Sequence, residues 1–238
     1  MSANEAKDER HSLLFARRSF HLLSLSSIAV ITVLLPFCSF VLCVFWSLID
    51  KFDASTSTHC NVLNFLPSVS AAIGAFSPQK YIWKFAIALH TIPRYFLSVT
   101  FFSLKHRSPL ALIFNLIEIT ALLALSLVTS IENYAFHSKC FVLFVVSSIL
   151  HMIALTSKDF SRRKAHRKYL LMGNTAATIF AVYFFLRHNW FCEPGMYSLF
   201  AFCEYVVVVT NMAFHFQIYY DLKHIDCCLL QEENHFHI

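Results

Sequence analysis

Six long apolar segments, separated by polar stretches, dominate the chain. They span residues 22–49, 81–104, 109–131, 141–156, 169–186 and 197–220. Most of them approach the length of about 20 apolar residues that a helix needs to cross the hydrocarbon core of a bilayer. The pattern predicts an all-α, polytopic membrane protein. Its six transmembrane helices form one bundle (22–222) between an N-terminal tail (1–21) and a C-terminal tail (223–238).

The composition agrees with a membrane protein, and the basic residues orient it. Of the 238 residues, 57% are hydrophobic and 14% are charged, whereas about 25% of the residues in a soluble domain are charged. Most Lys and Arg residues lie in the N-terminal tail and in the loops 105–108 and 157–168. The Lys and Arg residues of the opposite loops are Lys51, Lys80, Lys139 and Arg187. Because basic loops stay in the cytosol, we expect both termini there, and the net charge does not indicate a nucleic acid partner.

The longest polar connection between two apolar segments covers residues 50–80. Within it, Pro67 stands where a short helix would begin and Gly74 stands where that helix would end. The apolar positions between them would share one helical face. This segment, expected on the lumenal side, is therefore either a short helix resting on the membrane surface or a plain ordered loop.

The last apolar segment contains three polar side chains on one face. Glu204 precedes Asn211 by seven residues, and His215 follows Asn211 by four, so all three lie on the same side of a helix. A charge in hydrocarbon costs several kcal/mol, so this face should contact protein or enclosed water. The face is either a polar stripe that joins helices or a substrate site.

Counting about 1.5 Å of rise per residue from the lumenal ends gives the depth of the other buried polar groups. Arg94 and Glu118 both lie roughly 18–21 Å deep on adjacent segments, and we expect a structural ion pair. His151 lies at the same depth, so a metal site of His151, Glu118 and one further ligand is geometrically feasible. No HExxH or paired CxxC spacing supports it, and we predict no metal. His215 lies near about 27 Å, below this layer.

Three cysteines, Cys60, Cys140 and Cys192, fall on the expected lumenal side, where a disulfide persists. We predict a bond between Cys60 in the long first loop and Cys192 in the turn before the last segment. Cys140 is the competing partner, but its short turn has little reach. The Cys60–Cys192 bond would hold the 64–74 segment over the mouth between the second and sixth helices.

Several stretches of the chain form a distinctive set, namely Asn64–Gly74, Pro78–Trp83, His90, Pro93-Arg94, Ser147-Ser148, His151-Met152, Arg187–Asn189, Cys192-Glu193, Gly195, Glu204-Tyr205 and Thr210–His215. Together these stretches resemble the post-GPI-attachment-to-proteins factor 2 family. The resemblance covers roughly residues 20–222, and neither tail matches. It implies a multi-pass protein of the Golgi membrane, and of the endoplasmic reticulum membrane as the alternative. It also implies lipid remodelling of GPI anchors after protein attachment, at the step where a saturated fatty acid replaces an unsaturated one.

The resemblance leaves the biochemical role open between an acyltransferase and a non-catalytic adaptor that presents the lipid to a separate acyltransferase. In the catalytic version His90 would be the general base and Glu204 would orient it, since their depths differ by only about 4 Å. The expected partners are the GPI glycolipid or GPI-anchored proteins and membrane lipids, with no cofactor. The expected substrate-binding residues are Asn64, Ser68, Lys80, Arg187, His188 and Asn211. A small-solute or proton-coupled transporter using Glu118, His151 and Asn211 is a third hypothesis. The lack of an internal repeat and the few Gly breaks within the apolar segments stand against it.

Overall fold

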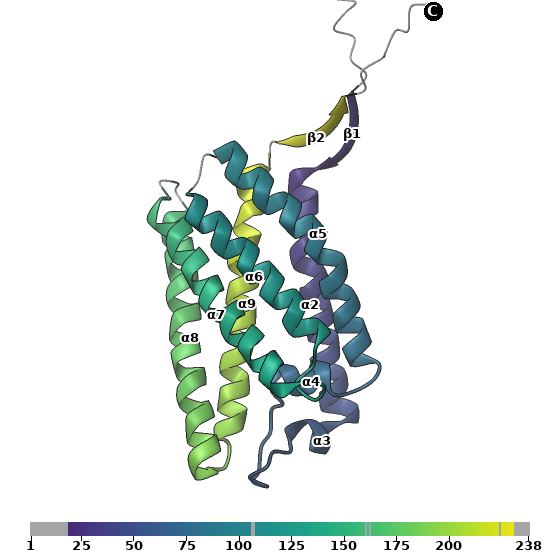
Figure 1. Ribbon diagram of the computed structural model, residues 1–238, viewed down its shortest axis with the longest axis vertical. Helices are drawn as coiled ribbons and strands as arrows, with labels where there is room; N and C mark the ends of the chain where they lie inside the picture. The colour runs from purple at the N-terminus through teal and green to yellow at the C-terminus, as the bar shows by residue number, and fades with distance from the viewer. Residues whose placement is uncertain (1–18, 106–107, 160, 162, 224, 231–238) are drawn as a thin grey trace, which may run out of the picture.

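In the computed structural model, six long helices form the body of the protein (Figure 1). The structure describes residues 19–105, 108–159, 161, 163–223 and 225–230. Within these ranges, six helices are long and apolar enough to cross a membrane. They are α2 (Leu25–Asp50), α5 (Gln79–Lys105), α6 (Pro109–Leu127), α7 (Tyr134–Ser157), α8 (Lys164–Phe191) and α9 (Met196–Leu222). The prediction of an all-α polytopic membrane protein with six spans is confirmed.

Local sequence signals set the helix ends. The side chain of Ser24 caps α2, Pro109 occupies the first turn of α6, and Asn133 Oδ1 accepts from the Phe136 amide at the start of α7. The helix α7 therefore begins at Tyr134 rather than at the expected residue 141, and α6 ends at Leu127 rather than at 131. In the turn between α8 and α9, Cys192 ends α8 in a left-handed conformation.

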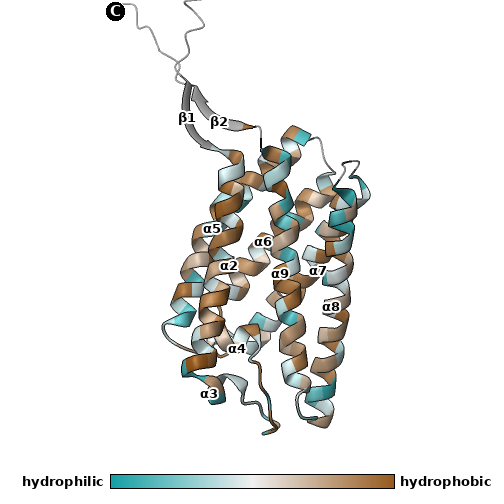
Figure 2. Cartoon of the chain, turned by 180° about the vertical axis from the view of Figure 1, so that it is seen from behind, coloured by the Kyte–Doolittle hydropathy of each residue, from teal (hydrophilic) through white to brown (hydrophobic). Residues whose placement is uncertain are grey.

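The six helices form a closed ring. Around it α2 packs against α5, α5 against α6, α6 against α7, α7 against α8, α8 against α9, and α9 against α2. The neighbours α7 and α8 touch least. Figure 2 shows the helices mainly in brown, with hydrophilic teal residues gathered toward their ends. Large apolar side chains such as Ile92, which is 77% exposed, face outward where lipid lies in a membrane.

Two apolar clusters hold the ring together at its two ends. One contains Leu25, Phe101, Met152 and Phe214, from α2, α5, α7 and α9. The other contains Phe40, Cys43, Val44, Ala72, Ile73, Trp83 and Ile87, from α2, α5 and the short helix α4 (Val69–Gly74). Between these clusters the ring encloses polar side chains and open space.

The first connecting loop is ordered at the end of the bundle that carries α4 (Figure 1). After the short helix α3 (Phe52–Thr56) the chain forms a segment that we call the cap (residues 57–78). Ser68 begins α4 by accepting from the Ala71 amide, and the Ser47 hydroxyl of α2 donates to the Ala72 carbonyl. The cap thus contains the expected short helix, which packs on α2 and α5.

The two ends of the described chain meet at the opposite end of the bundle. Strand β1 (Ser19–Ser24) pairs antiparallel with β2 (Asp226–Leu230), and Ser19 lies opposite Leu230. The expected tails therefore contain a two-stranded ribbon that the apolar pattern did not predict. The rest of the expected tails, residues 1–18 and 231–238, lies outside the described residues.

Candidate functional site

A cavity of about 820 Å³ occupies the centre of the ring beneath the cap. Residues of α2 and of α4 to α9 line it, and its wall is mostly apolar. Its volume falls within the range of about 300–1,000 Å³ typical of ligand sites. The lining residues Val142 of α7 and Val182 of α8 are 58% and 55% exposed, so the cavity opens sideways where these two helices touch least.

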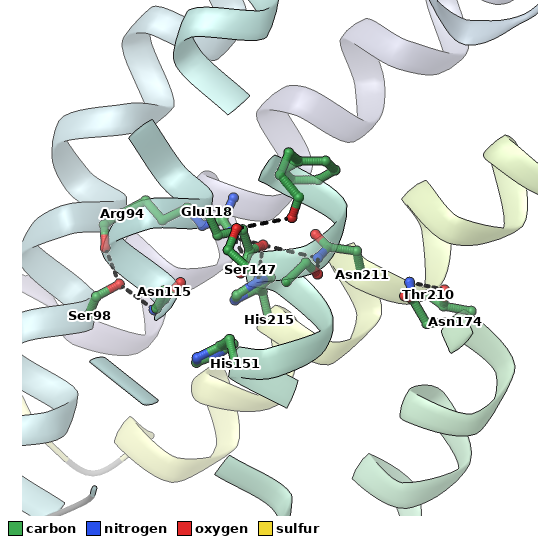
Figure 3. Close-up of polar contacts among 12 residues, drawn as sticks. Arg94, Ser98, Asn115, Glu118, Ser147, His151, Asn174, Thr210, Asn211 and His215 are labelled. Atoms are coloured by element: carbon green, nitrogen blue, oxygen red, sulfur yellow. Dashed lines mark hydrogen bonds and ion pairs between the residues drawn. The ribbon is translucent and has the colours of Figure 1, made fainter. Parts of the chain in front are cut away.

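A polar cluster borders the cavity near the middle of the helices (Figure 3). Glu118 of α6 is fully buried, and its Oε1 accepts from Arg94 Nη2 of α5 at 2.7 Å and from Asn211 Nδ2 of α9 at 3.0 Å. His215 Nε2 lies 2.8 Å from the same oxygen and 2.6 Å from Arg94 Nη2. The expected ion pair is thus part of a larger network joining three helices.

His151 extends this network into α7. Its Nδ1 donates to the Ala111 carbonyl at 2.9 Å, and its ring stacks on that of His215 with centroids 5.3 Å apart. The depth count placed His215 below this layer. The structure corrects that expectation, because the His215 side chain reaches the Glu118 carboxylate.

The same residues raise the question of a metal ion. Ligand atoms of Glu118, His151 and His215 all lie within 4.8 Å of one another. His215 is therefore the third candidate ligand, which the depth count had not identified. However, the Arg94 guanidinium lies 2.6 Å from His215 Nε2, and a metal cation would be repelled by it. The arrangement fits an ion-pair network better than a metal centre.

Two neutral hydrogen bonds flank the cluster and tie helix pairs (Figure 3). Asn115 Nδ2 of α6 donates to Ser98 Oγ of α5 at 2.8 Å, and Asn174 Nδ2 of α8 donates to Thr210 Oγ1 of α9 at 2.9 Å. Such side-chain bonds between membrane helices are modest, about 0.6 kcal/mol on average. They fix the rotation of the helices, so the buried network keeps its geometry.

The cap is joined to the turn between α8 and α9 by one covalent bond, and to this turn and the start of α9 by several hydrogen bonds. Cys60 and Cys192 form a disulfide with a Cα–Cα distance of 5.3 Å. Ser198 Oγ accepts from the amides of Phe65 and Leu66, and the Gly195 amide donates to the Leu63 carbonyl at 3.0 Å. At a φ of 76°, Gly195 adopts a left-handed conformation that costs glycine little.

The expected catalytic pair does not form a hydrogen bond in the structure, although both residues line the cavity. Glu204 Oε2 accepts from the Val69 amide at 3.0 Å. His90 Nδ1 is 2.7 Å from the Ile87 carbonyl of its own helix, and His90 Nε2 has no hydrogen-bond partner among the described residues. Glu204 therefore holds the cap, and His90 presents one unpartnered nitrogen inside the ring.

The expected substrate-binding residues divide into two groups. Ser68 and Asn211 line the cavity, and Ser68 Oγ also accepts from the Tyr197 hydroxyl at 2.8 Å. The remaining four, Asn64, Lys80, Arg187 and His188, are not among the lining residues.

These four residues have other contacts. Asn64 Nδ2 donates to the Thr56 and Val62 carbonyls, and Lys80 Nζ lies 5.0 Å from the centre of the Tyr81 ring. Arg187 pairs with Glu193. His188 is buried beside the Tyr197 ring.

The turn between α6 and α7 carries an acidic group near the cap. Glu132 Oε2 accepts from the Thr129 amide at 2.8 Å, and Lys84 Nζ lies 3.4 Å from Oε1. The Thr129 amide and hydroxyl, followed by Lys84, hold the pKa of the Glu132 carboxyl below its usual value. This carboxylate stabilises the turn that leads into α7.

Sequence reasoning did not single out two further residues of the cavity wall, Ser70 and His137. His137 fell in a stretch expected to be a turn, but it lies in the first turn of α7. The signal that would have found it is Asn133, a favoured helix-capping residue four positions earlier.

Comparison with known proteins places the chain in a family. Residues 24–225 match the family model described as the Frag1/DRAM/Sfk1/Cwh43P N-terminal domain. "Post-GPI attachment to proteins factor 2" of Caenorhabditis briggsae is 41% identical over 216 residues, which is 79% of this chain and 81% of that protein. "Acyltransferase PGAP2" of Xenopus tropicalis is 36% identical over 221 residues, or 84% of this chain and 88% of that protein.

More distant similarity extends to a much longer protein. "Protein cwh43" of Schizosaccharomyces pombe is 28% identical over 164 residues, which is 66% of this chain and 17% of that protein. No solved structure matches this chain. From the family match over residues 24–225, we conclude that this chain belongs to the Frag1/DRAM/Sfk1/Cwh43P N-terminal domain family.

Proposed function

We propose that this protein remodels the lipid of GPI anchors after their attachment to proteins, by exchanging a fatty acid for a saturated one. The names of its relatives support this process, because several are called post-GPI attachment to proteins factor 2. The proposed partners are GPI-anchored proteins or the free GPI glycolipid, together with the surrounding membrane lipids.

The observation that carries the proposal is the cavity of about 820 Å³ within the ring of helices. Its apolar wall suits an acyl chain, because a chain that moves from the bilayer to this wall exchanges one apolar surrounding for another. Its end beneath the cap is lined by polar groups such as Ser68, Tyr197 and Glu204. A lipid can therefore place its chain inside the ring and its ester and headgroup against the cap. The sideways opening between α7 and α8 gives such a lipid a path from the bilayer.

Catalysis by this chain itself is favoured over presentation of the lipid to a separate acyltransferase. One relative, to which this chain is similar over most of its length, is named as an acyltransferase. The cavity also encloses groups suited to proton transfer, which a protein that only presents lipid does not need. In the adaptor alternative, a partner acyltransferase would reach the lipid at the cap.

The proposed topology places both termini in the cytosol and the cap in the lumen of the Golgi, with the endoplasmic reticulum as the alternative compartment. The pairing of β1 with β2 supports a common side for the two ends of the chain. The Cys60–Cys192 disulfide supports an oxidising compartment for the cap. The basic loops 105–108 and 157–168 support the cytosol for the other end of the bundle.

The test is complementation of cells that lack the endogenous factor, with mass spectrometry of the lipid on a GPI-anchored reporter. Ala181 lines the cavity, and Ala176 lies on the exposed face of the same helix, α8. The wild-type chain and Ala176→Phe should restore saturated chains, whereas Ala181→Phe fills the cavity and should not. Normal remodelling by Ala181→Phe at equal protein level would show that the cavity does not hold the lipid.

A further inference from the structure

Ser70 of the cap and His137 of α7 contact one another. Ser70 Oγ lies 2.9 Å from His137 Nε2, although the residues are 67 positions apart. The other ring nitrogen, His137 Nδ1, lies 2.8 Å from the Val128 carbonyl oxygen. A carbonyl only accepts hydrogen bonds, so Nδ1 carries the proton in the neutral ring. His137 Nε2 is then free to accept the hydrogen of the Ser70 hydroxyl.

This is the geometry of an activated serine. The base lies within hydrogen-bond reach of the hydroxyl, and a third group orients the base. Here the orienting group is a main-chain carbonyl in the turn between α6 and α7. Because that turn is also fixed by the bond between Glu132 and the Thr129 amide, the imidazole has a rigid support.

The other hydroxyls near the cap have different roles. Ser47 Oγ donates to a main-chain carbonyl, Ser68 Oγ caps α4, and Ser198 Oγ accepts from two amides of the cap. Among the described residues, Ser70 is the only hydroxyl hydrogen-bonded to an imidazole nitrogen. The pair is therefore singled out by its contacts and not by residue type alone.

The position of the pair matches the place where a lipid ester would lie. Both residues line the cavity, His137 is 9% exposed and Ser70 is half-buried. They lie at the cap end, where the apolar wall gives way to polar groups. An acyl chain inside the ring would bring its ester carbonyl close to Ser70 Oγ.

We propose that Ser70 and His137 form a catalytic dyad that transfers a long acyl chain from a membrane phospholipid ester to the hydroxyl of a lyso-GPI. The assignment rests on the proposed function and adds its catalytic residues, its donor class and its covalent intermediate. A phospholipid is the donor because the cavity opens to the bilayer, where such esters are the surrounding solvent.

The reaction has two balanced steps. In the first, Ser70 Oγ attacks the donor's ester carbonyl and gives its proton to His137 Nε2. The donor's ester C–O bond breaks, its alkoxide leaves as lysophospholipid with the proton from Nε2, and Ser70 carries the acyl ester. In the second step, the lyso-GPI hydroxyl gives its proton to Nε2 and attacks the acyl-serine. Ser70 Oγ leaves and regains the proton, and no oxidant or reductant is needed.

The experiment uses the full chain reconstituted in phosphatidylcholine nanodiscs whose stearoyl chains carry deuterium. The acceptor is a lyso-GPI-anchored reporter protein, and transfer is followed by mass spectrometry. Ser70→Ala and His137→Gln should each lower the rate by at least about a thousandfold, as for other serine nucleophiles and their bases. With wild-type protein and no acceptor, a deuterated stearoyl ester should appear on the peptide that contains Ser70.

A matched variant separates catalysis from structure. Ser70→Asn supplies an N–H that still donates to His137 Nε2, so it keeps the contact between α4 and α7 but removes the nucleophile. It should match wild type in thermal stability and match Ser70→Ala in activity. Transfer by Ser70→Asn or Ser70→Ala at more than a tenth of the wild-type rate would overturn the dyad.

The outcome also distinguishes the two proposals from each other. If wild-type protein neither transfers the chain nor restores remodelling in cells, the proposed function fails. If wild-type protein transfers the chain and the Ser70 variants do so equally, the function stands and the dyad is wrong. A wild-type protein that restores remodelling in cells without transferring the chain in nanodiscs overturns the dyad and favours the adaptor.

Discussion

Removal of one member of the buried Arg94–Glu118 pair should destabilise the bundle strongly. Glu118 is fully buried, and the Arg94 side chain is 11% exposed. Arg94→Leu leaves the carboxylate with only Asn211 and His215 as partners. Uncompensated buried charges cost about 3–5 kcal/mol. For a chain of this size, that loss corresponds to a fall of roughly 6–20 °C in unfolding temperature.

The double variant Arg94→Leu/Glu118→Leu should be more stable than either single variant. It removes both charges together and replaces them with apolar side chains. What remains is the loss of the Glu118 acceptor for Asn211 and His215, and side-chain hydrogen bonds between membrane helices are worth about 0.6 kcal/mol each on average. The charge term therefore dominates, and the double-mutant cycle should report a coupling of about 2 kcal/mol or more.

The assay is thermal unfolding of the purified protein in detergent, followed by tryptophan fluorescence. Ser98→Ala is the control, because it removes the neutral bond from Asn115 and should lower stability by less than about 1 kcal/mol. If the stability losses of the two single variants add up to the loss of the double variant within about 0.5 kcal/mol, Arg94 and Glu118 are not coupled. The ion-pair interpretation of the cluster would then be wrong.

Three other predictions follow from the cap and the ends of the chain. Cys60→Ser or Cys192→Ser should lower stability and GPI remodelling, because their bond closes a loop of 132 residues worth about 5 kcal/mol in the chain-entropy model; Cys140→Ser should change neither, and free thiols at Cys60 and Cys192 in non-reducing peptide maps would contradict the bond. A tag after Ile238 should be accessible in cells with only the plasma membrane permeabilised and a tag near Ser57 should be protected; the reverse pattern would place the cap in the cytosol. Because the pKa of Glu132 is lowered in the folded protein, its contribution to stability should be full above the unfolded pKa of about 4.3 and disappear as the pH falls through the lower folded pKa; the unfolding temperatures of wild type and Glu132→Ala should therefore differ at pH 7 and converge as the pH is lowered below about 4.3, and a constant difference would refute the assignment.

Much of the fold could be predicted because the bilayer imposes it. Main-chain N–H and C=O groups in hydrocarbon must form hydrogen bonds within each segment, because no water reaches them. A long apolar segment therefore forms a helix. The pairing of Arg94 with Glu118 was also accessible, since the tight turn between α5 and α6 brings their equal depths onto neighbouring helices. Segment depth and loop length therefore suffice to predict side-chain contacts between two helices that a short turn connects.

The rest of the site depends on long-range packing that local rules do not contain. The pairing of His90 with Glu204 assumed that α5 and α9 meet, and they do so through Arg94 and His215. Glu204 nevertheless accepts from the Val69 amide of the cap, and His90 Nδ1 faces the Ile87 carbonyl of its own helix. The depth count missed His215 because it followed main-chain positions and ignored the reach of the side chain. Ser70 and His137 meet only because the cap folds back over the end of α7, which no spacing in the sequence encodes.

The loose contact between α7 and α8 has a kinetic consequence. The helices α8 and α9 are held together at both ends, by the Arg167–Asp221 ion pair and by the turn that carries Cys192. The sideways opening of the cavity therefore lies between α7 and α8, in a wall of the bundle whose exposed side chains are apolar. A substrate that enters there never crosses water. Its effective concentration is then its mole fraction among the lipids of one leaflet, not its amount per volume of solution. Diluting the substrate with inert lipid should slow turnover, while diluting the vesicles with buffer should leave turnover per enzyme unchanged.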